Sequence, residues 1–88
     1  MDDEINTKHL IYYKTIKNRC PYDEWLNTLD NKTKSIIENR LERIRDGLYG
    51  NHRRIANSEL SELKIDFAKG YRIYYKDLSN IIIIIIAG

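Results

Sequence analysis

The sequence is poor in the residues that build disulfides, metal sites and chain breaks. Its one cysteine, Cys20, excludes an internal disulfide, and a free thiol suits a reducing cytosol. One cysteine and two distant histidines, His9 and His52, do not supply the clustered ligands of a structural zinc site. One proline and four glycines among 88 residues leave no linker to divide the chain. We therefore expect a single domain over residues 1–88.

Export signals and long apolar segments are also missing. The isoleucine run Ile81–Ile86 is far shorter than the about 20 apolar residues of a membrane helix. The N-terminus begins with acidic residues rather than with the basic and apolar regions of a signal peptide. A formal net charge of +2 does not by itself select a nucleic-acid partner, so any basic surface must come from local placement. These features predict a cytoplasmic protein without a membrane contact.

The first half of the chain contains two helical patterns. Pro21 suits the first position of a short helix, and the apolar residues that follow it keep helical spacing as far as Leu29. Asp30 or Asn31 suits the N-cap of a longer helix that runs to about Asp46. That second helix has an apolar stripe formed by Ile37, Leu41, Ile44 and Leu48. Gly47 follows in the place of a C-terminal cap.

The remaining patterns are those of strands. Residues His9–Thr15 are rich in β-branched and aromatic types, and a hairpin is predicted from Leu60 to Lys76 with a turn at Ala68–Gly70. This turn keeps both apolar sets on one face by pairing Phe67 with Tyr71, Ile65 with Ile73, and Leu63 with Tyr75. The opposite face then holds the pairs Asp66–Arg72, Lys64–Tyr74 and Glu62–Lys76, two of which join opposite charges.

The isoleucine run predicts a strand, because six residues at about 3.3 Å each span roughly 20 Å. Since the run has no polar alternation, we expect burial on both faces, as in a central strand. If one face is uncovered, the same run becomes an aggregation hazard unless a partner protein or self-association covers it.

Three motifs carry a resemblance to a known family. They are Pro21–Leu26 (PYDEWL), Gly47–Asn51 (GLYGN), and Glu62–Asp66 (ELKID) followed by Gly70–Tyr75 (GYRIYY). In this order and spacing the chain resembles the HigB-type, phage-derived addiction module killer toxins of the RelE/ParE superfamily. The resemblance implies an α+β fold of order β-α-α-β-β-β, with two N-terminal helices packed on a four-stranded, mainly antiparallel sheet.

The same resemblance implies the toxin of a type II toxin–antitoxin system, an mRNA interferase that cleaves mRNA, often on the ribosome, without a metal or other cofactor. The implied partner is a cognate antitoxin, commonly a helix-turn-helix DNA-binding protein. Two departures are visible. Lys64 stands where the family has arginine, and the sequence shows no G-x-K-x-x-Q segment or terminal helix after Gly88. Two alternatives therefore stay open: a gyrase-inhibiting toxin of the same superfamily, and a truncated, inactive remnant that only binds antitoxin.

Cleavage of RNA by its own 2′-hydroxyl needs cations that stabilise the charge developing on the phosphate. Arg72 is the candidate for this role, because a guanidinium matches phosphate geometry. Lys64 is the candidate second cation, or a base if it is buried, and Tyr74 is the candidate for stacking on a base. Candidate contacts to the nucleic-acid backbone are Arg53, Arg54 and Lys76.

Each of these residues also has a purely structural interpretation. Arg72 pairs with Asp66 in the predicted register, which would occupy its charge. Lys64 and Tyr74 would then be solvated residues of an exposed sheet face, and Arg53 and Arg54 a surface pair. Nothing in the sequence orients His52 as an acid or base.

Overall fold

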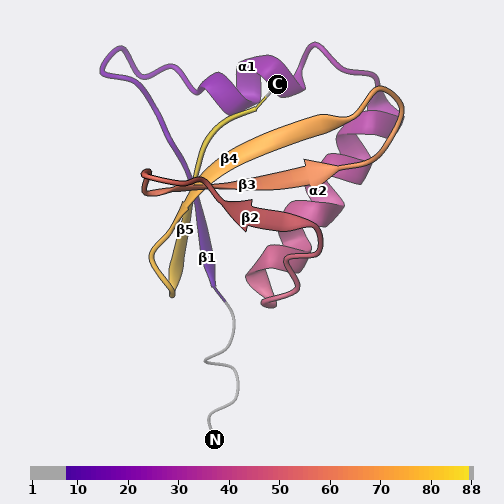
Figure 1. Cartoon of the computed structure of the whole chain (residues 1–88). Helices are drawn as coiled ribbons and strands as arrows, with labels where there is room; N and C mark the ends of the chain where they lie inside the picture. Colours follow the sequence, from indigo (N-terminus) through magenta and orange to yellow (C-terminus); the bar gives the residue numbers. More distant parts are fainter. Residues whose placement is uncertain (1–7, 88) are drawn as a thin grey trace, which may run out of the picture.

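A computed structural model of the chain describes residues 8–87. In chain order the elements are β1 (His9–Tyr12), α1 (Pro21–Leu26), α2 (Asn31–Arg45), β2 (His52–Arg54), β3 (Leu60–Ile65), β4 (Tyr71–Asp77) and β5 (Ile81–Ala87) (Figure 1). The five strands form one sheet in the order β1-β5-β4-β3-β2. Strand β1 is parallel to β5, and the other neighbouring pairs are antiparallel, so the sheet is mixed.

This architecture corrects the expected fold class. The prediction of two helices packed on a four-stranded, mainly antiparallel sheet is wrong. The structure is mostly β, with a five-stranded mixed sheet and a first helix of only six residues. The strand that the sequence did not reveal is β2, whose residues were assigned to no helix or strand. It has three residues, all exposed, and so lacks apolar alternation. It is a strand because it pairs with β3, not because of its own pattern.

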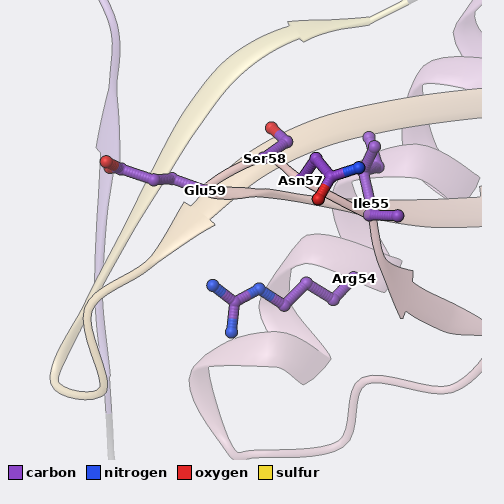
Figure 2. A pocket seen from close by; sticks show the side chains of 6 residues that line it. Arg54, Ile55, Asn57, Ser58 and Glu59 are labelled. Carbon is purple, nitrogen blue, oxygen red and sulfur yellow. The ribbon is translucent and has the colours of Figure 1, made fainter.

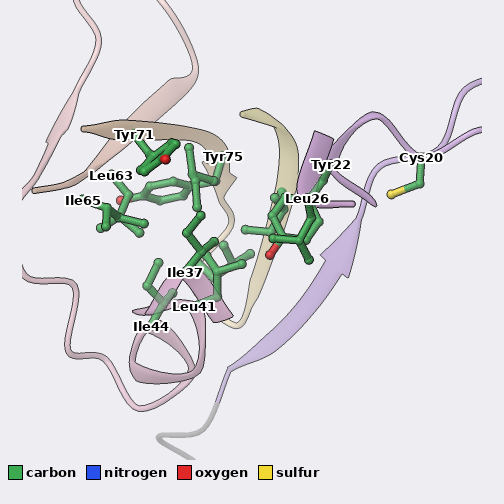
Figure 3. Packing of buried hydrophobic residues seen from close by; sticks show 13 residues of the cluster. Cys20, Tyr22, Leu26, Ile37, Leu41, Ile44, Leu63, Ile65, Tyr71 and Tyr75 are labelled. Carbon is green, nitrogen blue, oxygen red and sulfur yellow. The ribbon is translucent and has the colours of Figure 1, made fainter. Parts of the chain in front are cut away.

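The hydrophobic core joins the helices to one face of the sheet (Figure 3). Ile37 and Ile44 of α2 have no exposed surface, and Leu41 is 1% exposed, which confirms the predicted helical stripe at these positions. Leu48 is 62% exposed and lies beyond the end of α2, so its place in the stripe is wrong. The core cluster is made of Cys20, Tyr22, Leu26, Ile37, Leu41, Ile44, Leu63, Ile65, Tyr71, Ile73, Tyr75, Ile82 and Ile84.

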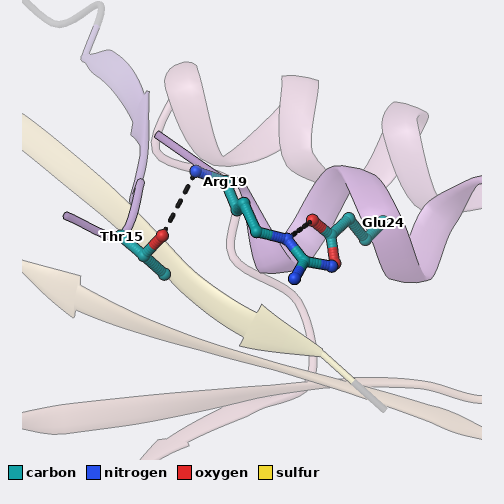
Figure 4. A network of polar contacts seen from close by, with 3 residues as sticks. All are labelled: Thr15, Arg19 and Glu24. Carbon is teal, nitrogen blue, oxygen red and sulfur yellow. Dashed lines mark hydrogen bonds and ion pairs between the residues drawn. The ribbon is translucent and has the colours of Figure 1, made fainter. Parts of the chain in front are cut away.

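Before α1, a loop is fixed by a small polar network (Figure 4). The Arg19 side chain donates from Nε (2.7 Å) and Nη2 (2.9 Å) to the two carboxylate oxygens of Glu24, and its backbone N–H donates to the Thr15 hydroxyl oxygen (3.2 Å). This bidentate pair lies on the surface at the first turn of α1. It is a useful reference for the other arginine–glutamate pairs of the chain.

The C-terminus of α2 has the geometry of a Schellman motif. The Gly47 N–H donates to the carbonyl oxygen of Ile44 (2.9 Å), and the Leu48 N–H donates to that of Arg43 (2.9 Å). Gly47 has a φ of +81°, which side chains with a Cβ adopt only with strain. The predicted capping role of Gly47 is therefore confirmed.

We expect the substitution Gly47→Ala to lower the free energy of unfolding by about 1 kcal/mol. An added Cβ would have no heavy atom within 4 Å, so the loss comes from backbone conformation rather than from a clash. Urea denaturation of both proteins measures the difference. Ser35→Ala, at an exposed position of α2, is the control and should change stability by about 0.5 kcal/mol or less. Equal midpoints for Gly47→Ala and the parent would contradict the argument.

The register of the β3–β4 hairpin differs from the prediction by two residues. The observed partners include Leu63 with Ile73, Ile65 with Tyr71, and Lys64 with Arg72. The connection spans 66–70, and the Gly70 N–H donates to the carbonyl oxygen of Phe67 within it. Because a shift of two preserves the alternation of the side chains, each residue keeps its predicted face although its predicted partner is wrong.

The isoleucine run forms the predicted central strand, β5, between β1 and β4. Its burial on both faces is only partly as expected. Ile82 and Ile84 are fully buried on the core side, whereas Ile86 is 47% exposed. A bulge between Tyr74 and Tyr75 shifts the register of β5 against β4 within the run. One side of this strand is therefore uncovered among the described residues.

Candidate nucleic-acid interface

The side of the sheet opposite the core carries a set of polar residues. Alternation along β3 and β4 buries Leu63, Ile65 and Ile73, so the residues between them point the other way. Strand β2 adds Arg53, which is the cross-strand partner of Glu62. We call the following set the polar face: Arg53, Glu62, Lys64, Arg72, Tyr74 and Lys76.

Glu62 is the centre of the polar face. Arg53 Nε donates to its Oε1 at 2.8 Å, and Arg72 Nη1 lies 3.2 Å from its Oε2. The Glu62 side chain is 3% exposed, whereas Arg53 and Arg72 keep 69% and 51% of their side chains exposed. One buried carboxylate thus holds two arginines that still face solvent.

The arginines also set the protonation state of Glu62. The hydrogen bond from Arg53 lowers the pKa of the Glu62 carboxyl, and the positive charge of Arg72 and a hydrogen bond from Tyr74 lower it further. Burial acts in the opposite direction but does not prevail. Glu62 is therefore a carboxylate at neutral pH, and the ion pair with Asp66 expected for Arg72 is replaced by one with Glu62.

Lys64 lies directly across from Arg72. Like charges in facing positions destabilise a sheet, so this pairing is not explained by sheet stability. With Asp66 and Lys69, the two residues line a shallow hollow of about 330 Å³ at the hairpin end of the polar face. Within residues 8–87 no carboxylate forms an ion pair with Lys64. Positive charge is therefore concentrated at this end.

Tyr74 stands at the border of the polar face with an apolar surface. It is half-buried and lies between Glu62 on β3 and Ile86 on β5. Ile83 pairs with both Lys76 and Ile11, so it continues the same side of the sheet. We call Ile11, Ile83 and Ile86 the isoleucine patch; Ile11 and Ile86 are each 47% exposed.

Two of the three residues predicted to contact the nucleic-acid backbone lie away from the centre of the polar face. Lys76 is at its far end, with Nζ 2.6 Å from a carboxylate oxygen of Glu59. Arg54 alternates to the other side of β2, where it pairs with Ser61 and lines a hollow of about 480 Å³ with the 55–59 turn (Figure 2). Arg53 alone of the three joins the arginine–glutamate cluster.

His52 does not join the cluster either. It pairs with Leu63, which places it on the core side of the sheet. Its Nδ1 lies 2.9 Å from the carbonyl oxygen of Gly50, and the centroid of its ring lies 4.9 Å from the ring centroid of Tyr49. Within residues 8–87, no group of three or more histidine, cysteine or acidic side chains is placed to hold a metal ion.

The residue that sequence reasoning missed is Glu62, which was expected only to balance Lys76. Alternation already placed it on the same side as Lys64, and that signal was available. The contact of Glu62 with Arg53 could not be predicted in this way, because β2 has no sequence signature of its own.

Comparison with known proteins gives one family relationship. An uncharacterized protein of Haemophilus influenzae is 34% identical over 74 residues, which make up 83% of this chain and 74% of that protein. No family model matches the chain, and no solved structure matches it significantly. Neither helix of residues 8–87 has the length and apolarity needed to cross a membrane.

Proposed function

This chain belongs to the same family as the Haemophilus influenzae protein, and we propose that it is the toxin of a type II toxin–antitoxin system that cleaves mRNA in the cytoplasm. The observation that carries the proposal is the polar face, where Arg53, Arg72 and Lys64 gather beside Tyr74. Exposed guanidinium groups next to an aromatic ring suit a phosphate with its neighbouring base. The motifs that resemble HigB-type toxins include three of these residues, Lys64, Arg72 and Tyr74.

In the proposed reaction the 2′-hydroxyl of the RNA loses its proton and attacks the adjacent phosphorus. The bond to the 5′-oxygen of the next nucleotide breaks, and that oxygen takes up a proton. Arg72 stabilises the negative charge that develops on the phosphate, and Lys64, its cross-strand partner, is the second cation. Tyr74 stacks on a base beside the cleaved bond. The products are a 2′,3′-cyclic phosphate and a 5′-hydroxyl.

RNA cleavage is assayed both with and without translating ribosomes. We expect the purified protein to cut mRNA in at least one of the two assays and to leave cyclic phosphate ends. RNA with a 2′-deoxy substitution at the cleavage site should remain intact, because it lacks the attacking oxygen. Primer extension and end analysis of the products measure both results. Intact RNA together with arrested DNA gyrase would contradict the proposal in favour of a gyrase-inhibiting toxin.

The isoleucine patch favours a second candidate, a chain that binds an antitoxin without cleaving RNA. Ile11 and Ile86 expose apolar surface beside the cations of the polar face, which is a composition typical of a protein-binding surface. On this proposal, the antitoxin covers the patch. Tight binding of a co-encoded helix-turn-helix protein by a chain that leaves RNA intact would favour this candidate.

A further inference from the structure

The burial of Glu62 is unusual for its position. Carboxylates are rarely buried unless they are paired, because removing a charge from water is costly. Here the carboxylate is in contact with two arginines that themselves remain largely exposed. The ion pair of Arg19 with Glu24 shows the ordinary arrangement, in which one arginine takes both oxygens and both side chains are about half exposed or more.

Glu62 instead divides its oxygens between two strands. Oε1 accepts from Arg53 on β2, and Oε2 faces Arg72 on β4, so the carboxylate bridges across β3. Each arginine uses one nitrogen for this contact. Within residues 8–87, the two terminal nitrogens of Arg53 make no hydrogen bond. The same holds for Nε and Nη2 of Arg72. Several donors on two fixed guanidinium groups are thus available to a ligand.

The charges suit a singly negative oxyanion. Two guanidinium groups and one carboxylate leave a net charge of +1 in the cluster, with Lys64 next to it. Without the carboxylate, the two long side chains would repel each other and lose their fixed orientation. A shared anion between them holds the donors in place before the ligand arrives, and such preorganisation increases both affinity and rate.

We propose that Glu62 is a positioning residue that holds Arg53 and Arg72 as a two-arginine clamp for one phosphodiester group of the RNA. The inference rests on the proposed function for the identity of its ligand. It adds Arg53 to the groups that contact the phosphate, and it gives Glu62 a role although Glu62 does not touch the substrate.

The test compares Glu62→Gln with the parent in a binding assay that does not require cleavage. A short 2′-O-methyl RNA, which lacks the attacking hydroxyl, is titrated while the arginine side-chain N–H resonances are followed by NMR. In the parent, the resonances of Arg53 and Arg72 should shift together. In Glu62→Gln, whose amide can accept from only one arginine, we expect affinity to fall at least ten-fold and kcat for RNA cleavage to fall about 10²-fold.

Glu24→Gln is the matched control, because it removes the carboxylate of an arginine pair on α1 and should change neither quantity. If Glu62→Gln does not fold, Arg53→Ala replaces it, since Arg53 is exposed and lies on the edge strand. The clamp predicts the same ten-fold loss of affinity for Arg53→Ala, whereas a site made by Arg72 alone predicts no loss.

The two proposals fail separately. Joint shifts of both arginines, without RNA cleavage by the parent, would overturn the proposed function and leave the clamp standing. RNA cleavage with unchanged kcat and affinity in Glu62→Gln would overturn the clamp. Independent shifts of Arg53 and Arg72 in the parent would overturn it as well.

Discussion

Replacing Arg72 with alanine is expected to abolish growth arrest on expression and to lower the rate of RNA cleavage about 10²–10³-fold. The reason is that Arg72 lies directly across from Lys64 and lines the hollow at the hairpin end of the polar face. Folding should be retained, because half of the Arg72 side chain is exposed and Glu62 keeps its hydrogen bond from Arg53. Cell growth after induction and single-turnover cleavage by the purified variant measure the two effects.

Arg19→Ala is the matched control. It removes an exposed arginine from an ion pair with glutamate, and it changes the net charge by the same amount, but it lies before α1 and away from the polar face. Its toxicity should equal that of the parent. Arg72→Lys, which keeps the charge and loses the planar fork, should fall between the two. Full toxicity of a folded Arg72→Ala protein would refute the role assigned to Arg72.

The largest expected effect on stability is that of Ile84→Ala. Ile84 is fully buried on the core side of β5, an interior strand of the sheet, and its truncation leaves a cavity. We expect a loss of about 2–5 kcal/mol in the free energy of unfolding. Since small domains are stable by only about 5–15 kcal/mol, this loss removes much of the total. Urea denaturation followed by circular dichroism measures it.

The same run of isoleucines provides the control. Ile86→Ala makes an identical chemical change two residues away, at a position that is 47% exposed, and should lose less than about 1 kcal/mol. Similar losses at both positions would mean that the isoleucine patch is covered in solution, for example by self-association. Repeating the measurement at several protein concentrations tests for self-association, because a contribution from association makes the apparent stability depend on concentration.

Local patterns in the sequence predicted the local structure well. The spacing of Ile37, Leu41 and Ile44 identified the buried side of α2, because helix periodicity depends only on neighbouring residues. Gly47 marked the end of that helix for the same reason. Alternation in β3 and β4 likewise assigned Lys64, Arg72 and Tyr74 to one face, and it did so even though the register was wrong by two residues.

Non-local pairing is what the sequence did not reveal. The parallel contact of β1 with β5 joins His9 to Ile81, and no short-range pattern specifies it. Strand β2 exists only through its pairing with β3, so the contact of Arg53 with Glu62 was hidden as well. The fold class and the centre of the candidate site were therefore missed for one physical reason, since both depend on neighbours that are distant in the chain.

The place of β5 in the sheet has a consequence for folding during synthesis. It follows every other described element in the chain, yet it lies between β1 and β4, so neither β1 nor the core can reach its final contacts until β5 has been translated. Synthesis proceeds from the N-terminus at about 5–20 residues per second, so the earlier strands wait for seconds with an open edge. Folding is thus coupled to the synthesis of β5, because the core is complete only after the isoleucine strand has left the ribosome.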